Sequence, residues 1–316
     1  MITPHLLVIG GVNIDLLVGP QAPWPTPGTE VILDHSDLRV GGGGGNTALA
    51  LEALSVPSVL VGGYGNDAFG PWLREKFTGV LCDWHQSASP TGLCVGITHP
   101  DGDRTFFTHM GHLGDDPPER VYRALDRAGP GSTALFTAGF LMALWLPEYD
   151  QLLSYARARG VRVALDTGWP PPGWTPEVRA MVRSWLGKTD LLLINELEAT
   201  ALAETDDVYA AGMVLLEQLA QDATLIIKRG PWGAAAWVGS QQVEVSAPQV
   251  QVVDTIGAGD TFNAAFLAAQ YDGRSLQNSM AAAVAYASHS ISTQPRTYAA
   301  TLGDPLQDRP TELSRP

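Results

Sequence analysis

The stretch that decides the fold is "VDTIGAGDTFNAAF", from Val253 to Phe266. Glycines bracket a turn directly before Asp260, and small and apolar residues follow it. Glycine supplies backbone angles that other residues avoid, and Asp is a favoured N-cap, so the stretch predicts a turn leading into a helix. Such a turn also presents free N–H groups at the positive end of the helix dipole, where phosphate binds. Asp260 beside that site could accept the proton of an attacking hydroxyl.

The turn can therefore be a helix cap without chemistry or a catalytic turn. Other phosphate-binding motifs do not account for it. The chain has no G-x-x-x-x-G-K-[ST] pattern, which excludes a P-loop. The segment "GAGDTF" lacks the third glycine of the dinucleotide-binding fingerprint, and it does not lie in a first βαβ unit.

Composition restricts the partners of the protein. The 316 residues include 19 basic and 33 acidic side chains, which give a formal net charge of -14, and 45% of the residues are hydrophobic. These values are typical of a globular protein whose surface repels nucleic acids and anionic membranes. We therefore expect neither as a partner. Any phosphate must be held locally, by backbone N–H groups, a few basic side chains and a bound cation.

Cysteine usage and hydropathy predict a cytoplasmic protein. Cys82 and Cys94 have neither metal-ligand spacing nor the pattern of a disulfide framework. The first residues lack the basic region and cleavage site of a signal peptide. The longest apolar run, about residues 134–146, is too short to span a bilayer, which takes roughly 20 residues.

Strand and helix patterns alternate along most of the chain. Strand patterns occupy residues 5–9, 58–65, 133–139, 161–168, 190–196, 224–230 and 250–253. Helix patterns occupy residues 46–55, 67–77, 149–160, 176–186, 198–204, 210–220 and the residues after Gly259. This alternation predicts an α/β fold, with a mainly parallel central sheet between two layers of helices.

Further strand patterns at residues 15–18 and 29–40, and a hairpin pattern at 91–110, interrupt this alternation. They predict a small separate β-sheet, built from lid segments at about 12–40 and 91–110. We expect a single domain over residues 1–300. The polar, proline-rich residues 301–316 predict a loose C-terminal tail.

A second marker is "VGGGGGNTA", from Val40 to Ala48. Five consecutive glycines can form a plain flexible linker. Here a strand pattern precedes them and a helix pattern follows at once, which is unusual for a linker.

Together the two markers resemble the two signatures of the ribokinase-like (PfkB) carbohydrate kinase family. D-T-x-G-A-G-D-x-F is similar to the second signature, and G-G-x-G-x-N to the first. The resemblance covers about residues 5–298, and "GGYGNDAFG" (Gly62–Gly70) is a further, structural match. It implies a ribokinase-like three-layer α/β/α fold, with a mainly parallel central sheet and a small β-sheet lid.

The resemblance implies a catalytic role for the turn. Asp260 would be the base that accepts the proton of the substrate hydroxyl. The N–H groups of Gly257, Ala258 and Gly259 would form an anion hole for the charge that develops during phosphoryl transfer.

The same family places a monovalent cation beside this turn in many members. Asp254 and Ile256 match the positions that bind it, through side-chain and backbone oxygen, so K⁺ is a candidate cofactor. The sequence departs from the pattern at Ser292, where several members have glycine.

Sugar binding is implied for residues from three parts of the chain. The glycines would let the backbone close against a sugar, while amide and carboxylate groups hydrogen-bond its hydroxyls. An arginine on the lid hairpin would also reach the substrate, although a solvated arginine is an equal alternative. The residues are Asn13, Asp15, Gly41, Gly42, Asn46 and Arg104.

Nucleotide and metal binding are implied by two further segments. In "INELEA", Asn195 and Glu198 match the N-x-x-E that organises Mg²⁺ and its water shell, which suits an ion that keeps several waters. In "IIKRGPWGAA", Lys228, Gly230 and Gly233 match the K-x-G-x-x-G-A of the ATP site.

The implied activity is ATP-dependent phosphorylation of a primary hydroxyl of a small sugar, of ribose, fructose or sugar-acid type. Gly43 stands where ribokinases proper tend to have lysine. A nucleoside kinase of the same fold is the alternative, since "RTFFTHM" and Trp24, Trp145 and Trp169 could stack a base or cover the core. A non-catalytic sugar sensor is a third reading, and a homodimer through the lid is expected from the family.

Overall fold

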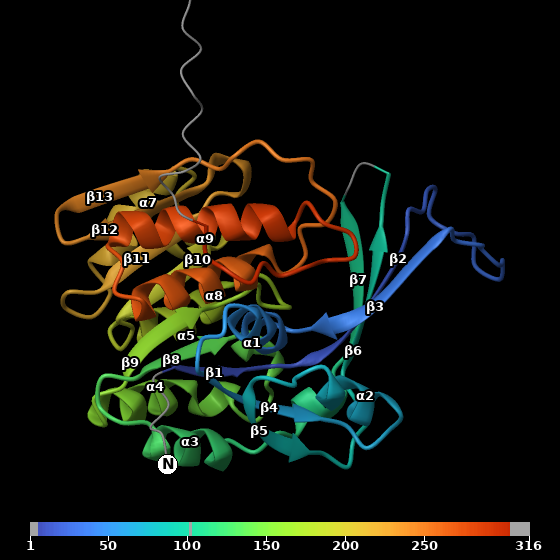
Figure 1. Cartoon of the computed structure of the whole chain (residues 1–316), viewed down its shortest axis with the longest axis horizontal. Coiled ribbons are helices and arrows are strands. Elements are labelled where there is room, and N and C mark those ends of the chain that lie inside the picture. The colour runs from blue at the N-terminus through green and yellow to red at the C-terminus, as the bar shows by residue number, and fades with distance from the viewer. Residues whose placement is uncertain (1–5, 101–102, 304–316) are drawn as a thin grey trace, which may run out of the picture.

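The structure is a computed structural model that describes residues 6–100 and 103–303 (Figure 1). Its main feature is a nine-stranded sheet of strand order β13-β12-β11-β10-β9-β8-β1-β4-β5. Neighbouring strands are parallel from β11 to β5, and β12 and β13 extend the sheet as antiparallel strands. The strands are β1 (Leu6–Gly10), β4 (Val59–Tyr64), β5 (Leu81–Gln86), β8 (Thr133–Thr137), β9 (Arg162–Asp166), β10 (Leu191–Asn195), β11 (Thr224–Lys228), β12 (Ala234–Val238) and β13 (Gln241–Val245).

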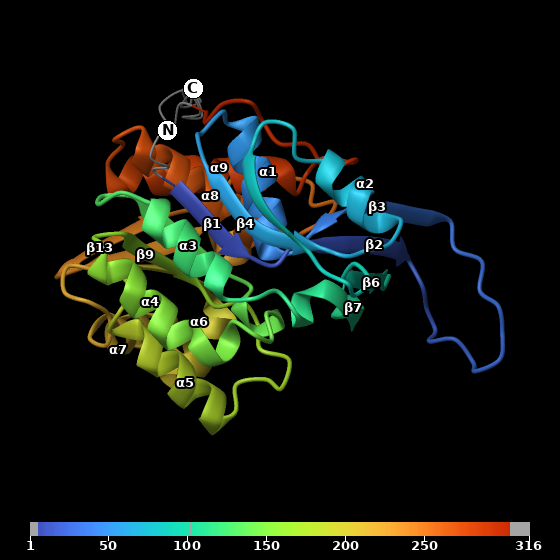
Figure 2. The same cartoon turned by 90° about the horizontal axis from the view of Figure 1, so that it is seen from below.

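Helices cover both faces of this sheet, so its inner strands are apolar on both sides (Figures 1 and 2). Leu7 and Ile9 of β1 pack into the core under α3 (Glu119–Arg127), α4 (Tyr149–Ala158), α5 (Pro176–Leu186), α6 (Glu196–Ala203) and α7 (Val208–Leu216). Leu6 and Val8 point the other way. They join the core under α1 (Gly43–Ala53), α2 (Phe69–Glu75), α8 (Ala258–Tyr271) and α9 (Leu276–Ser290). Short 3₁₀ turns lie at Gly111–Gly114, Gly139–Leu141, Leu146–Glu148 and Gly230–Trp232.

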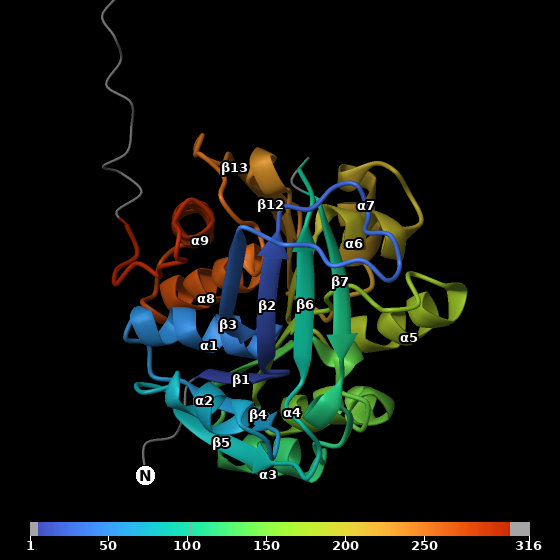
Figure 3. The ribbon, with the colours of Figure 1, turned by 90° about the vertical axis from the view of Figure 1, so that its right-hand side faces the viewer.

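A second sheet of strand order β3-β2-β6-β7 stands beside the central one, and we call it the lid sheet (Figure 3). It consists of β2 (Asn13–Gly19), β3 (His35–Gly41), β6 (Leu93–Thr98) and β7 (Arg104–His109). All four strands come from the two predicted lid segments. Because β2 begins at Asn13, three residues after β1 ends at Gly10, the lid sheet continues directly from the carboxyl edge of the central sheet.

The structure therefore confirms the predicted ribokinase-like α/β architecture with its parallel sheet and β lid. One predicted strand, at 29–40, begins later than expected, and another, at 250–253, does not form. Residues 29–34 form no strand, because β3 pairs with β2 only from His35, opposite Gly19; Ile32 is 88% exposed and has no partner strand. Residues 250–253 lie in an irregular loop before α8.

Other elements have different boundaries or were not predicted. Helix α1 begins at Gly43, inside the glycine run, rather than at Asn46. The strands β5, β12 and β13 were not expected, and they lie at or next to the two ends of the sheet. The expected hairpin turn falls partly on residues 101–102, and the expected tail mostly on 304–316, which are outside the described residues.

Two further findings concern membrane-spanning helices and the two cysteines. Among the described helices, none has the length and apolar character needed to cross a bilayer. Cys82 in β5 and Cys94 in β6 are both free thiols.

Candidate functional site

The carboxyl edge of the central sheet positions the site. Parallel strands end in register there: Gly10 of β1 lies opposite Thr137 of β8, and Thr137 opposite Asp166 of β9. Asn195 of β10 lies opposite Lys228 of β11 in the same way. In open α/β sheets, ligands bind outside this edge.

The turn before α8 leaves backbone donors free. Gly257 is the N-cap, with φ 72° in the left-handed region that suits glycine. Asp260 is thus the third residue of the helix and not its cap. Ala258 N donates to the Thr255 carbonyl at 3.1 Å, but within the described chain no acceptor pairs with the N–H of Gly257 or Gly259.

Asp260 lies where this turn meets the glycine run. Asn46 Nδ2 donates to Asp260 Oδ2 at 2.9 Å, and a Cβ atom on Gly43 would lie 3.3 Å from Asp260 Oδ1. Burial raises the pKa of Asp260, and the nearby charge of Asp166 raises it further, while the hydrogen bond from Asn46 opposes the change. A carboxylate with a raised pKa is a stronger base at neutral pH.

Four of the predicted sugar-binding residues meet where β2 begins and β3 leads into α1. Asn13 pairs with Gly41, and Asn13 Nδ2 donates to Asp15 Oδ1 at 2.8 Å. Side chains at either glycine would collide with these groups: a Cβ on Gly41 would meet the Asp15 carboxylate, and one on Gly42 would lie 2.7 Å from Asn13 Oδ1. Burial raises the pKa of Asp15 to about 6.

Asn195 and Glu198 form a reciprocal capping box at the start of α6. Glu198 N donates to Asn195 Oδ1 at 2.8 Å, and Asn195 N donates to Glu198 Oε2 at 3.0 Å. Burial raises the pKa of Glu198 to about 7, and the charge of Asp166 contributes. The carboxylate is therefore fixed at the sheet edge, close enough to Asp166 to interact with it.

Lys228 is held by residues that the sequence analysis missed. Its Nζ donates to Asp166 Oδ2 at 2.8 Å and to Asn263 Oδ1 at 3.3 Å, and Asn263 Nδ2 also donates to Asp166. A Cβ on Gly259 would lie 3.2 Å from Lys228 Nζ, so this ammonium group lies beside the turn before α8. The signal for Asp166 was present, because it ends a strand pattern, and parallel strands bring such ends together.

The two remaining glycines of the predicted ATP segment shape the turn between β11 and β12. Gly230 has φ 53° and Gly233 has φ 89°. A Cβ on Gly233 would collide with the Val245 carbonyl, whereas one on Gly230 would meet nothing within 4 Å. No contact in the described chain joins either glycine to Asp260.

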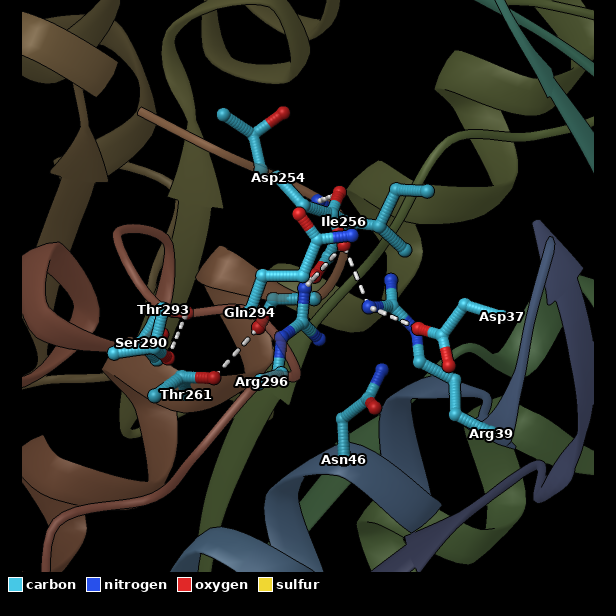
Figure 4. A network of polar contacts seen from close by, with 12 residues as sticks. Asp37, Arg39, Asn46, Asp254, Ile256, Thr261, Ser290, Thr293, Gln294 and Arg296 are labelled. Atoms are coloured by element: carbon cyan, nitrogen blue, oxygen red, sulfur yellow. Dashed lines mark hydrogen bonds and ion pairs between the residues drawn. The ribbon is translucent and has the colours of Figure 1, made fainter. Parts of the chain in front are cut away.

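The predicted cation residues are bound instead by arginines (Figure 4). Asp254 Oδ2 is 2.6 Å from Arg39 Nη1 and 3.1 Å from Arg296 Nη2, and its Oδ1 accepts from Arg104 Nη2 at 3.0 Å. Arg296 Nη2 also donates to the Ile256 carbonyl. Both atoms expected to hold K⁺ are thus ligated by one guanidinium group, and the residues do not fit a monovalent ion.

Arg104 connects the lid to this cluster. It also donates to Thr255 Oγ1 at 2.8 Å, so it reaches from β7 to the loop before α8. With Arg39 and Arg296, it lines a cavity of about 320 Å³ between the lid and the loops at 253–254 and 293–296. Asp260 does not line that cavity.

The donors fit Mg²⁺ that is held through water. Within residues 6–100 and 103–303, no group of three or more His, Cys, Asp or Glu side chains could hold a metal directly. Glu198 is a single buried carboxylate, 4% exposed, with one oxygen left by the capping box. Mg²⁺ usually keeps several waters and takes one or two carboxylates plus phosphates.

The tryptophans have different environments. Trp145 is fully buried in the core, and Trp169 lies at the surface against Trp174. Trp24 is 55% exposed and packs against Phe107 of the lid, with 6.0 Å between ring centroids. Trp145 is therefore unable to stack a substrate base.

Comparison with known sequences points to one family. The model of the pfkB family carbohydrate kinases matches residues 3–299. A ribokinase of Arabidopsis thaliana is 29% identical in an alignment of 309 positions that covers 90% of this chain and 75% of that protein. A ribokinase of Bacillus subtilis is 27% identical in an alignment of 317 positions that covers 98% of this chain and 99% of that protein.

Solved structures share the fold. Arabidopsis thaliana ribokinase, complexed with ribose and ATP, superposes with a TM-score of 0.76 at 25% identity, over 95% of this chain and 97% of that one. Two Escherichia coli structures, each 20% identical to this chain, have the same fold. A putative ribokinase II with ATP and Mg²⁺ has a TM-score of 0.78 (96% and 97% covered), and phosphofructokinase-2 with potassium has 0.76 (96% and 98% covered).

Proposed function

Because the chain belongs to the pfkB family of carbohydrate kinases, we propose that it transfers the γ-phosphoryl group of ATP to a primary hydroxyl of a small sugar, of ribose, fructose or sugar-acid type. The observation that carries this proposal is the convergence at the sheet edge. Asp260, with its raised pKa, lies beside the free N–H groups of Gly257 and Gly259 and is joined to the glycine run through Asn46.

The residues divide the reaction between them. Asn13, Asp15 and Asn46 bind the sugar hydroxyls and orient one of them toward Asp260. Asp260 takes the proton of that hydroxyl while the hydroxyl oxygen bonds to the γ-phosphorus of ATP. The bond between the γ-phosphorus and the bridging oxygen breaks, and ADP leaves. The N–H groups of Gly257 and Gly259 stabilise the negative charge that develops on the phosphoryl oxygens.

Lys228 and Glu198 serve the nucleotide side. The ammonium group of Lys228 lies beside Gly259, where it can contact the phosphates, and Asp166 keeps it charged and in place. Glu198 and Asn195 would hold Mg²⁺ through its water shell. When bound, that ion supplies positive charge that neutralises the phosphates.

The lid sheet excludes water from the reacting groups. Arg39 and Arg104, on strands β3 and β7, both bind Asp254 of the main body, so the lid is attached at the edge of the site. Exclusion of water strengthens the electrostatic interactions and limits hydrolysis of ATP.

One observation favours a nucleoside as the second candidate. Side chains alternate along a strand, so Phe106, two residues after Arg104, shares its face and points toward the site. Phe106 is 49% exposed, which leaves its ring free to stack on a base.

The test is ADP release with Mg-ATP across ribose, fructose, 2-keto-3-deoxygluconate, adenosine, inosine and cytidine. Wild type is compared with Asp260→Asn, and Asp206→Asn, an exposed loop residue, is the matched control. We expect turnover with one sugar, a loss of about 10²–10⁴-fold in kcat for Asp260→Asn, and no change for Asp206→Asn.

Other outcomes would change the proposal. Turnover with nucleosides alone would move the substrate class and keep the mechanism. An active Asp260→Asn enzyme would remove the role of the base. Heat stabilisation by one sugar, without turnover and without any effect of ATP, would favour a sugar sensor.

A further inference from the structure

We propose that Arg296 supplies, from the chain itself, the positive charge that a monovalent cation would otherwise place beside the catalytic turn, so that this kinase works without potassium. The inference rests on the proposed function and adds a positioning residue to it. It comes from this chain's own contacts, since the two oxygen-bearing residues expected to bind K⁺ already share one guanidinium group.

The first step is the position of that guanidinium group. Arg296 Nη2 donates to Asp254 Oδ2 at 3.1 Å and to the Ile256 carbonyl, and its side chain is only 6% exposed (Figure 4). Asp254 Oδ1 accepts from Ile256 N at 2.9 Å, which closes the loop on itself. Ile256 directly precedes Gly257, so the arginine holds the residue from which the catalytic turn starts.

The second step is charge. Asp254 already faces three guanidinium groups, from Arg39, Arg104 and Arg296. Hydrogen bonds from Ile256 N–H and the charge of Arg39 lower the pKa of Asp254, although burial alone would raise it, so the carboxylate is ionised and fully engaged. A further cation placed beside these guanidinium groups would be repelled by their positive charge.

The third step is the direction of the unused donors. Nε and Nη1 of Arg296 are buried and lack a well-aligned hydrogen bond in the described part of the chain, while the nearby Tyr298 hydroxyl also interacts with this guanidinium group. A Cβ on Gly257 would lie 2.8 Å from Arg296 Nη1 and 2.8 Å from Asn46 Nδ2. The free edge of the guanidinium group therefore faces the catalytic turn, where developing negative charge would meet it.

The fourth step is attachment. Val253 N and Asp254 N both donate to the Ile291 carbonyl at the end of α9, at 2.8 and 3.1 Å. Thr297 N donates to Thr293 Oγ1 at 3.0 Å, next to Arg296. The loop that carries Asp254 and the segment that carries Arg296 are thus joined, and the charge is held in place by the fold.

The experiment compares wild type, Arg296→Ala and the control Arg123→Ala, which changes an exposed arginine on α3. Initial rates are measured at saturating sugar and Mg-ATP, with potassium chloride replaced by tetramethylammonium chloride at constant ionic strength. Binding is followed separately by thallium-205 NMR and by thermal unfolding with potassium or lithium.

We expect wild type and Arg123→Ala to have the same rate in both salts and to leave the thallium signal unchanged. Arg296→Ala should lose about 10²-fold in kcat without potassium, the effect of misplacing a catalytic group by about 1 Å. Potassium, but not lithium, should restore part of that rate and raise the unfolding temperature of the variant.

The proposal is overturned if wild type needs potassium for activity, or if it binds thallium at a site that Arg296→Ala weakens. If Arg296→Ala does not fold, the rate and the thallium binding of the wild type still show whether this protein uses a monovalent cation. Thallium binding also separates this proposal from the proposed function, because it is measured without turnover. A wild type that is inactive on every sugar and nucleoside tested, with thallium bound only by Arg296→Ala, would support the role of Arg296 and contradict the proposed function.

Discussion

Asn46 Nδ2 donates a hydrogen bond of 2.9 Å to Asp260 Oδ2, joining two residues that are 214 positions apart in the sequence. The contact brings the glycine run at the start of α1 against the turn at the start of α8. It also stabilises the ionised form of Asp260, the proposed base, so it influences both the position and the pKa of that carboxylate.

Asn46→Ala removes a donor to the Asp260 carboxylate and should raise the pKa of that group. Since the base must be ionised to accept a proton, the acid limb of the pH profile of kcat should move up by about one unit. The KM for the sugar should rise as well. Asn278→Ala, an exposed residue of α9, is the control; an unchanged profile for Asn46→Ala would show that the contact does not tune the base.

Asp15→Asn should stabilise the protein above neutral pH. The pKa of Asp15 is raised from 3.8 to about 6 by burial, so the folded state binds this proton more tightly than the unfolded state. Its contribution is complete below pH 3.8 and is lost as pH rises through 6, by about 3 kcal/mol in total. Urea unfolding should therefore show no difference between variant and wild type near pH 4 and a more stable variant at pH 8.

The control for that prediction is Asp67, whose pKa is shifted in the opposite direction. Hydrogen bonds from Thr91 and from the N–H groups of Gly70 and Phe69 lower the pKa of Asp67, although burial alone would raise it. Asp67→Asn should thus destabilise the protein at neutral pH, and the difference should shrink in acid. If both variants changed stability equally at every pH, burial of Asp15 would not be the cause.

Asp166→Ala should cost about 3–5 kcal/mol of unfolding free energy, because it leaves Lys228 buried without its carboxylate partner. The double variant Asp166→Ala/Lys228→Met should recover a large part of that loss. Asp150→Ala, which breaks the exposed pair with Lys188, is the matched control and should cost less than about 1 kcal/mol. If the unfolding free-energy losses of Asp166→Ala and Lys228→Met simply added in the double variant, the two side chains would not be coupled.

The lid sheet should form a homodimer through its outer face. Leu38 and Phe107 lie on the face opposite Arg39 and Arg104, since side chains alternate along a strand, and they are 40% and 50% exposed. Sedimentation should show a dimer for wild type and a monomer for Phe107→Glu. Met213→Glu changes an exposed apolar residue on the remote helix α7 and should remain dimeric; a monomeric wild type would refute the prediction.

The sequence predicted the features that depend on local pattern. Buried parallel strands are near-continuous apolar runs, so β1, β8, β10 and β11 were found within a residue or two. Residues 29–34 also have β-branched side chains, but whether a strand forms depends on a partner, and β2 ends at Gly19. Pairing is a tertiary property that a local pattern does not contain.

The candidate site shows the same division. Asp260, Asn46 and Glu198 belong to motifs, and the structure places them at one sheet edge. Asp166 belongs to no motif, and its partnership with Lys228 depends on strand order. The arginines around Asp254 come from β3, β7 and the segment after α9, so only the fold reveals that they converge.

The loop that carries Asp254 is attached to the end of α9, and this attachment has a consequence for the order of events during synthesis. Every described strand of both sheets is complete once residue 245 has been made, before α8 and α9. A nascent chain that has reached only residue 290 contains these strands, but it lacks Ile291 to hold Asp254 and Arg296 to hold Ile256. If Asp260 acts as proposed, its turn is positioned for phosphoryl transfer only after residues 291–296 have been made.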